Sequence, residues 1–143
     1  MSAERALLLP MFLHAVWVLG LYAALTVVRA QAVSRGDARK DDFARLDGDP
    51  PRAARIARNL NNQFEAPLFA WVAVLLLVQA KSANGTDVAA GWLFLLGRVW
   101  HTFVQGTTDD VQLRGRVFAL NFVAILWLMV HAAVIVFAGS AFR

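Results

Sequence analysis

The sequence predicts an all-α integral membrane protein, a bundle of four helices that cross the bilayer. Hydrophobic residues make up 59% of the 143 residues and charged residues only 17%, whereas soluble domains have about 45–50% and about 25%. The apolar residues are gathered in four long runs. None of these runs shows the period-2 alternation of a membrane β-strand. We therefore expect one helical membrane domain over residues 1–143.

The four apolar runs cover residues 7–28, 64–80, 91–105 and 117–139. A helix needs about 20 residues to cross a hydrocarbon core of ~30 Å, and the first and last runs reach that length by themselves. The two middle runs reach it when a polar turn is added at their ends. Backbone groups in lipid must be hydrogen-bonded within the segment, so all four runs should be helical. The expected helices span about 7–28, 53–80, 89–105 and 115–139.

The basic residues are distributed unevenly between the two sides of this bundle. Residues 29–58 carry eight lysines and arginines, and the loop before the last run adds Arg114 and Arg116, against three on the opposite side. The positive-inside rule then places the first and third loops in the cytoplasm and both termini outside. The first run is longer than the ~7–15 apolar residues of a signal peptide, so we expect it to stay in the membrane.

The composition excludes several kinds of chemistry. The chain has no cysteine, which excludes a disulfide scaffold, a cysteine nucleophile and a thiolate-bound metal. His14 and His131 stand alone in the first and last runs, without the spacing of a metal-binding pair, so no metal site is expected. We interpret both as hydrogen-bonded bundle residues, with a haem held between them as a minor alternative. The net charge of +4 is small, and nucleic acid is not an expected partner.

Polar residues form one stripe on the expected second helix, where charge is costly. Arg58, Asn62 and Glu65 follow one another at i, i+4 and i+7, which places them on one helix face. A guanidinium, an amide and a carboxylate can together hold a zwitterionic ligand.

A second stripe lies on the expected third helix, where Arg98, His101, Thr102 and Gln105 share one face. The alternative for both stripes is structural, because Arg98 could form an interhelical ion pair with Glu65 that serves only the packing.

Two segments of the chain resemble the MAPEG family, the membrane-associated proteins in eicosanoid and glutathione metabolism. Residues 58–69 read RNLNNQFEAPLF and resemble the second-helix signature of the family, in the form typical of its bacterial branch. Residues 97–102 read GRVWHT and resemble the start of its third-helix motif. The length and the long first loop are also similar, so the resemblance covers nearly the whole chain. It implies a multi-pass protein of a bacterial inner membrane.

The resemblance also implies a homotrimer that binds glutathione as a co-substrate in a cleft between neighbouring subunits, near the cytoplasmic ends of the helices. An arginine at the start of the fourth helix would stabilise the thiolate. It is Arg114 if the alignment has no gap and Arg116 if the loop has a two-residue insertion. Residues expected to bind glutathione are Arg58, Asn62, Glu65, Arg98, Thr102, Gln105 and, from a neighbouring subunit, Arg29.

The implied activity is glutathione-dependent transfer or peroxide reduction on lipophilic electrophiles dissolved in the bilayer. A glutathione thiol has a pKa near that of free cysteine, about 8.5, and a guanidinium beside it favours the thiolate. The protein then needs no nucleophile of its own. The family also includes a lipid-binding member without catalysis, so a non-catalytic lipid-binding membrane scaffold is the alternative. The expected partners are membrane lipids, a lipophilic substrate and further copies of the chain.

Overall fold

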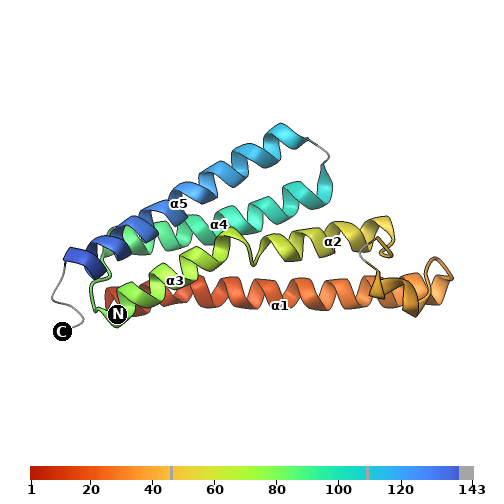
Figure 1. Ribbon diagram of the computed structural model, residues 1–143, viewed down its shortest axis with the longest axis horizontal. Helices are drawn as coiled ribbons and strands as arrows, with labels where there is room; N and C mark the ends of the chain where they lie inside the picture. Colours follow the sequence, from red (N-terminus) through yellow and green to blue (C-terminus); the bar gives the residue numbers. More distant parts are fainter. Residues whose placement is uncertain (46, 109, 139–143) are drawn as a thin grey trace.

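The computed structural model describes residues 1–45, 47–108 and 110–138, and these residues form helices and no strands. Figure 1 shows long rods lying side by side, with α1 and the segments of the second span below α4 and α5. The loops before α2 and before α5 lie at the same end of the bundle. Residue 139, the expected end of the last helix, lies outside the described residues. The elements are α1 (Ala3–Arg35), η1 (Lys40–Ala44), α2 (Pro51–Asn62), α3 (Ala66–Gln79), α4 (Gly85–Thr107) and α5 (Val111–Ala138).

The described helices confirm the all-α fold class and its membrane character. Three segments are long and apolar enough to cross a membrane: α1, the span made by α2 and α3, and α5. The fourth rod, α4, has 23 residues and packs against α1 and α5. It does not reach the same apolarity, and its Asp87 and Arg98 side chains are fully buried within the chain.

The helices begin and end at capping residues that lie outside the apolar runs. Ser2 precedes α1 and accepts a hydrogen bond from the backbone N–H of Arg5, and α1 ends at Gly36, whose φ of 79° is left-handed. Asn84 and Asp87 form a capping box at the start of α4. Because polar caps satisfy the free N–H groups of a helix end, these helices extend beyond the residues that lipid alone would require.

The second span is broken in the middle, whereas the sequence predicted one helix over 53–80. Its first part, α2, ends at Asn62, and α3 begins at Ala66. Pro67 lies in the first turn of α3, where it lacks the N–H that a continuous helix would donate to the carbonyl of Gln63. The two parts have different neighbours: α2 packs against α1 and α4, and α3 against α5 and α1.

The interior consists of two apolar clusters with polar side chains between them. The larger cluster joins α1, α3, α4 and α5 around residues such as Met11, Leu77 and Phe94. The smaller cluster joins α1 and α2 around Leu21 and Leu60. Buried polar side chains in the described residues are His14, Asn59, Gln63, Asp87, Arg98, His101 and Asn121.

A glycine allows α4 and α5 to approach closely. A Cβ placed on Gly97 would lie 2.8 Å from Nδ2 of Asn121, which is too short for a stable contact. That Nδ2 donates a hydrogen bond of 2.8 Å to the backbone carbonyl of Phe94. Small residues at such crossings let membrane helices bring their backbones together, and here Gly97 makes room for the buried amide.

Candidate functional site

Arg98 is the central charged group of the buried polar layer. Its side chain extends from α4 to the break in the second span, where Nε donates to Oε1 of Gln63 (3.0 Å) and Nη2 donates to the backbone carbonyl of Asn62 (2.8 Å). That carbonyl lies at the end of α2, where a helix leaves acceptors without an intrahelical partner. The third nitrogen, Nη1, is buried and has no hydrogen-bond partner among the residues that the structure describes.

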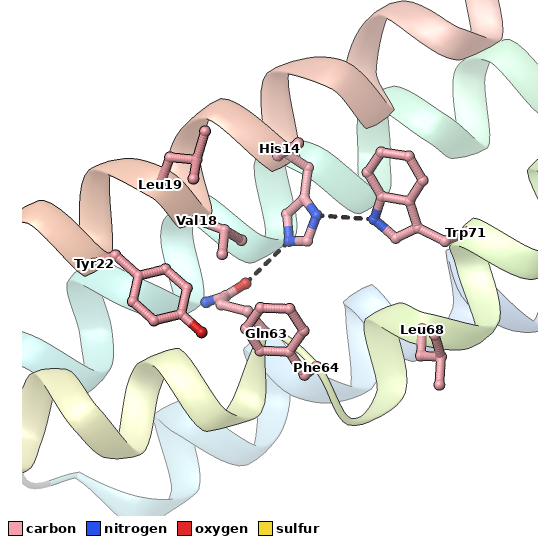
Figure 2. Close-up of a pocket in the computed structure, with 9 residues that line it drawn as sticks. His14, Val18, Leu19, Tyr22, Gln63, Phe64, Leu68 and Trp71 are labelled. Atoms are coloured by element: carbon pink, nitrogen blue, oxygen red, sulfur yellow. Dashed lines mark hydrogen bonds between the residues drawn. The ribbon is translucent and has the colours of Figure 1, made fainter.

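From Arg98 the hydrogen bonds continue through Gln63 and His14 to α1 and α3. Figure 2 shows the bond between Gln63 and His14 and the bond between His14 and Trp71. A guanidinium can only donate, so the Gln63 atom that it contacts is the amide oxygen. His14 Nε2 lies 3.1 Å from the same oxygen and therefore carries a proton. His14 Nδ1 then accepts a bond of 3.3 Å from Nε1 of Trp71. This pattern fits a neutral His14 and uses both of its ring nitrogens.

The other end of the Gln63 amide is also occupied. Its Nε2 donates to Oδ1 of Asn59 at 3.0 Å. The hydroxyl of Thr102 lies 3.3 Å from the same oxygen and 3.1 Å from the backbone carbonyl of Arg98, and it accepts a bond of 3.3 Å from Nε1 of Trp17. Thr102 therefore belongs to a network that ties α1, α2 and α4 together.

A cavity of about 290 Å³ lies where the end of α2, the end of α4 and the start of α5 meet, and we call it the polar cavity. Asn62 Nδ2 donates to Oε1 of Gln105 at 3.3 Å on its wall. His101 is 5% exposed, and within the described part of the chain its Nδ1 has no hydrogen-bond partner. The lining residues are Asn62, His101, Gln105, Val111, Arg114, Gly115 and Phe118.

The structure brings three of the expected site residues into this cavity: Asn62, Gln105 and Arg114. Arg114 is half-buried there, whereas Arg116 is exposed and is not part of the lining. Arg98 and Thr102 lie in the buried network instead.

The expected stripe on the second helix is divided by the break in that span. Arg58 and Asn62 lie on α2, but Glu65 follows the end of α2, and both Arg58 and Glu65 are exposed. Among the described residues no salt bridge joins Glu65 to Arg98.

Arg29 is engaged within its own chain. Its Nε and Nη2 donate to the two carboxylate oxygens of Asp49 at 2.7 and 2.6 Å. The guanidinium also lies 5.1 Å from the centre of the Phe43 ring. These contacts fasten the first loop to α1, and a contribution of Arg29 to a neighbouring subunit stays a prediction.

Two residues of the buried network, Gln63 and Asn59, were not selected from the sequence. Both lie inside the segment with the strongest family resemblance, next to residues that were selected, and this proximity was the available signal. The expectation that His14 and His131 are hydrogen-bonded bundle residues is confirmed. His131 Nδ1 lies 2.9 Å from Oδ1 of the buried Asp87, which also accepts a bond from Nε1 of Trp127.

The fold and the cavity define a class of protein: a helical membrane protein with a polar cavity between three helices at one end of the bundle. Residues 7–134 match the family model of the MAPEG family, and the chain belongs to this family. Comparisons with curated proteins and with solved structures give no match.

Proposed function

We propose that the protein is a glutathione-dependent transferase or peroxidase that acts on lipophilic electrophiles, with glutathione bound at the polar cavity. One observation carries the proposal: Arg114 lines the same cavity as Asn62 and Gln105, so a cation from α5 faces amides from α2 and α4. MAPEG membership supports this reading, because the resemblance matches Asn62 to a glutathione-binding position, places Gln105 at another, and makes Arg114 one of two candidates for the thiolate-stabilising arginine.

The polar cavity contains groups suited to a peptide thiol. The Arg114 guanidinium would favour the thiolate over the thiol. The amides of Asn62 and Gln105 offer hydrogen bonds to the peptide. In a transfer reaction the thiolate sulfur forms a bond to the electrophilic carbon, and the leaving group departs with its electron pair.

The size of the cavity supports a site shared between subunits. Its volume of about 290 Å³ lies just below the ~300–1,000 Å³ that is usual for small-molecule pockets. A tripeptide therefore needs further walls, which a homotrimer would supply. Arg58 and Glu65 are exposed on this chain and would bind the charged ends of glutathione, with Arg29 of a neighbouring copy nearby.

We further propose that the protein lies in a bacterial inner membrane with its first and third loops in the cytoplasm. The two basic loops lie at the same end of the bundle (Figure 1), and the polar cavity extends from the end of α4 and the start of α5 on that side to the end of α2, nearer the middle. Cytoplasmic glutathione would then reach the cavity directly, while lipophilic substrates would arrive from the bilayer.

The test is calorimetric titration of glutathione into the purified protein in detergent, with oxidised glutathione and cysteine as comparison ligands. Loss of a charge-assisted hydrogen bond costs about 1.5–3 kcal/mol, so Glu65→Gln should weaken binding roughly 10–150-fold. If the parent binds no glutathione, the proposed activity is wrong and the non-catalytic lipid-binding scaffold is favoured.

The role of Arg114 is tested against Arg116, its matched control on the same helix. A thiolate-stabilising group acts on reactivity more than on affinity, so Arg114→Ala should lower conjugation of a chlorodinitrobenzene-type electrophile with little change in binding. The ultraviolet absorption of the thiolate should then titrate at higher pH in Arg114→Ala than in the parent. Arg116→Ala should leave both measurements unchanged, and the opposite result would assign the role to Arg116.

A further inference from the structure

A second cavity, of about 440 Å³, opens between α1 and the junction of α2 and α3. We call it the apolar groove, and Figure 2 shows its walls. It shares no lining residue with the polar cavity. The lining residues are His14, Ala15, Val18, Leu19, Tyr22, Gln63, Phe64, Leu68 and Trp71.

The two polar side chains at the floor of the groove, His14 and Gln63, are hydrogen-bonded within the chain. Both ring nitrogens of His14 are engaged, one with Gln63 and the other with the indole N–H of Trp71. The Gln63 oxygen accepts from Arg98, and its nitrogen donates to Asn59. Apart from the Tyr22 hydroxyl, which lines the groove and makes no hydrogen bond among the described residues, the side chains of the lining are apolar or already paired, which favours an apolar occupant.

The groove lies at the depth of the lipid tails. The 14 residues of α3 cover only about 21 Å at 1.5 Å per residue, less than the ~30 Å hydrocarbon core. The part of the groove formed by Leu68 and Trp71 on α3 is therefore inside the hydrocarbon, and the junction before α3 lies toward the proposed cytoplasmic side of it. His14 lies well within the first apolar run. The side chains of Leu19, Phe64 and Leu68 at the rim are each more than half exposed, so they face the surrounding medium.

The chemistry of the cavity determines what can fill it. An apolar cavity does not hold ordered water, because water needs several polar partners there. If it stayed empty, its walls would lose dispersion contacts. Its volume is within the ~300–1,000 Å³ range of small-molecule sites, and hydrocarbon is the medium at its mouth.

Exposed apolar side chains do not distinguish the groove from other faces, because they occur along α1, α3 and α5 alike. The groove differs from those faces in being concave, which suits a flexible chain better than a second helix. We propose that the apolar groove binds one acyl chain of a membrane phospholipid. This site is separate from the proposed glutathione site and does not depend on it.

Tryptophan quenching by phospholipids with brominated acyl chains tests the proposal, because Trp71 forms part of the groove wall. The protein is placed in nanodiscs with increasing fractions of brominated lipid, and the emission of Trp71 is the difference between the parent and Trp71→Phe. Trp100 on α4 is half-exposed and outside the groove, and the parent minus Trp100→Phe reports contact with bulk lipid. Trp71 should show saturable quenching at low fractions, and Trp100 a gradual, linear loss.

Groove filling provides the matched pair of variants. Ala15→Phe places a ring inside the groove and should remove the saturable quenching of Trp71. Ala24→Phe adds the same ring at an exposed position of α1 outside the lining and should leave it intact. If circular dichroism shows that Ala15→Phe does not fold, Leu19→Trp replaces it as the groove-filling variant. Its readout is then the loss of bound brominated lipid.

Two results would overturn the proposal. Trp71 emission that brominated lipid does not quench would mean that protein, such as a second copy of the chain, covers the groove. Linear quenching of Trp71, unchanged in Ala15→Phe, would mean contact with bulk lipid only. Neither measurement uses glutathione, so a failure here is distinguishable from a failure of the proposed activity.

Discussion

Replacing Gln63 with leucine should destabilise the bundle, because one amide satisfies three buried partners. The substitution leaves Arg98 Nε and His14 Nε2 without their acceptor and removes the donor to Asn59. Leucine has a similar size and fits an apolar surrounding. The expected loss therefore comes from unpaired polar groups and not from a cavity.

The magnitude follows from these three contacts. A hydrogen bond to a charged group contributes about 1.5–3 kcal/mol and a neutral one about 0.5–1.5 kcal/mol. Interhelical bonds in membranes are often weaker, with an average of about 0.6 kcal/mol in one well-studied case. We expect a loss of about 3 kcal/mol for Gln63→Leu. Gln63→Glu keeps an acceptor for Arg98 and His14 and should cost only about 1 kcal/mol.

The assay is unfolding in mixed micelles of mild detergent and dodecyl sulfate, followed by circular dichroism, from which the free energy of unfolding is extrapolated. Gln79→Leu is the control, since Gln79 lies on α3 and is exposed, and its loss should change stability by no more than about 0.5 kcal/mol. If Gln63→Leu and Gln79→Leu unfold alike, the hydrogen bonds around Arg98 do not stabilise the bundle, and the reasoning is refuted.

Three further predictions follow from other contacts. Gly97→Ala should lower the free energy of unfolding by about 1–3 kcal/mol, because the new methyl group clashes with Asn121. Gly20→Ala, whose added Cβ meets nothing within 4 Å, should gain helix propensity instead. Equal thermal midpoints for the two variants would contradict this prediction. Asp49→Asn should weaken the ion pair by which Arg29 holds the first loop, and trypsin should then cleave this loop faster. Asp37→Asn, at an exposed position with no ion pair among the described residues, should not change the cleavage rate. Equal cleavage rates in the two variants would show that the Arg29–Asp49 pair does not hold the loop. A cysteine introduced by Ser34→Cys should react with an impermeant maleimide from the cytoplasmic side and one introduced by Ser82→Cys should not, and the reverse pattern would invert the proposed topology.

Apolar run length was enough to predict the helical class, because lipid imposes hydrogen-bonded helices on any long apolar segment. It could not predict helix ends, which depend on caps such as Ser2 and Asn84 that lie outside the runs. The break at residues 63–65 was missed although Pro67 marked it. The length of an apolar run does not change when a single N–H group is lost. In addition, the helix period was used to align Arg58, Asn62 and Glu65 on one face, although the break lies between Asn62 and Glu65.

The site was predicted in part for a similar reason. Asn62 was selected from the second-helix motif, Gln105 from its face of the third helix, and Arg114 as one of two candidate arginines, and the three do meet in one cavity. Gln63 was passed over because a helical stripe assigns it to another face than Asn62. Which polar side chains meet between helices depends on the register of the rods and on the turn at the break. Neither of these is encoded in the spacing within one helix.

The buried charges of α4 have a consequence for the order in which the chain enters the membrane. α1 and α5 are apolar enough to enter lipid by themselves, but α4 is not among the spans that meet this condition. Asp87 is satisfied by His131 and Trp127 on α5, which is synthesised after it. The hydrogen bonds from α5 that satisfy Asp87 can form only after α5 has been synthesised. We therefore expect α4 and α5 to enter the lipid together, as a hairpin.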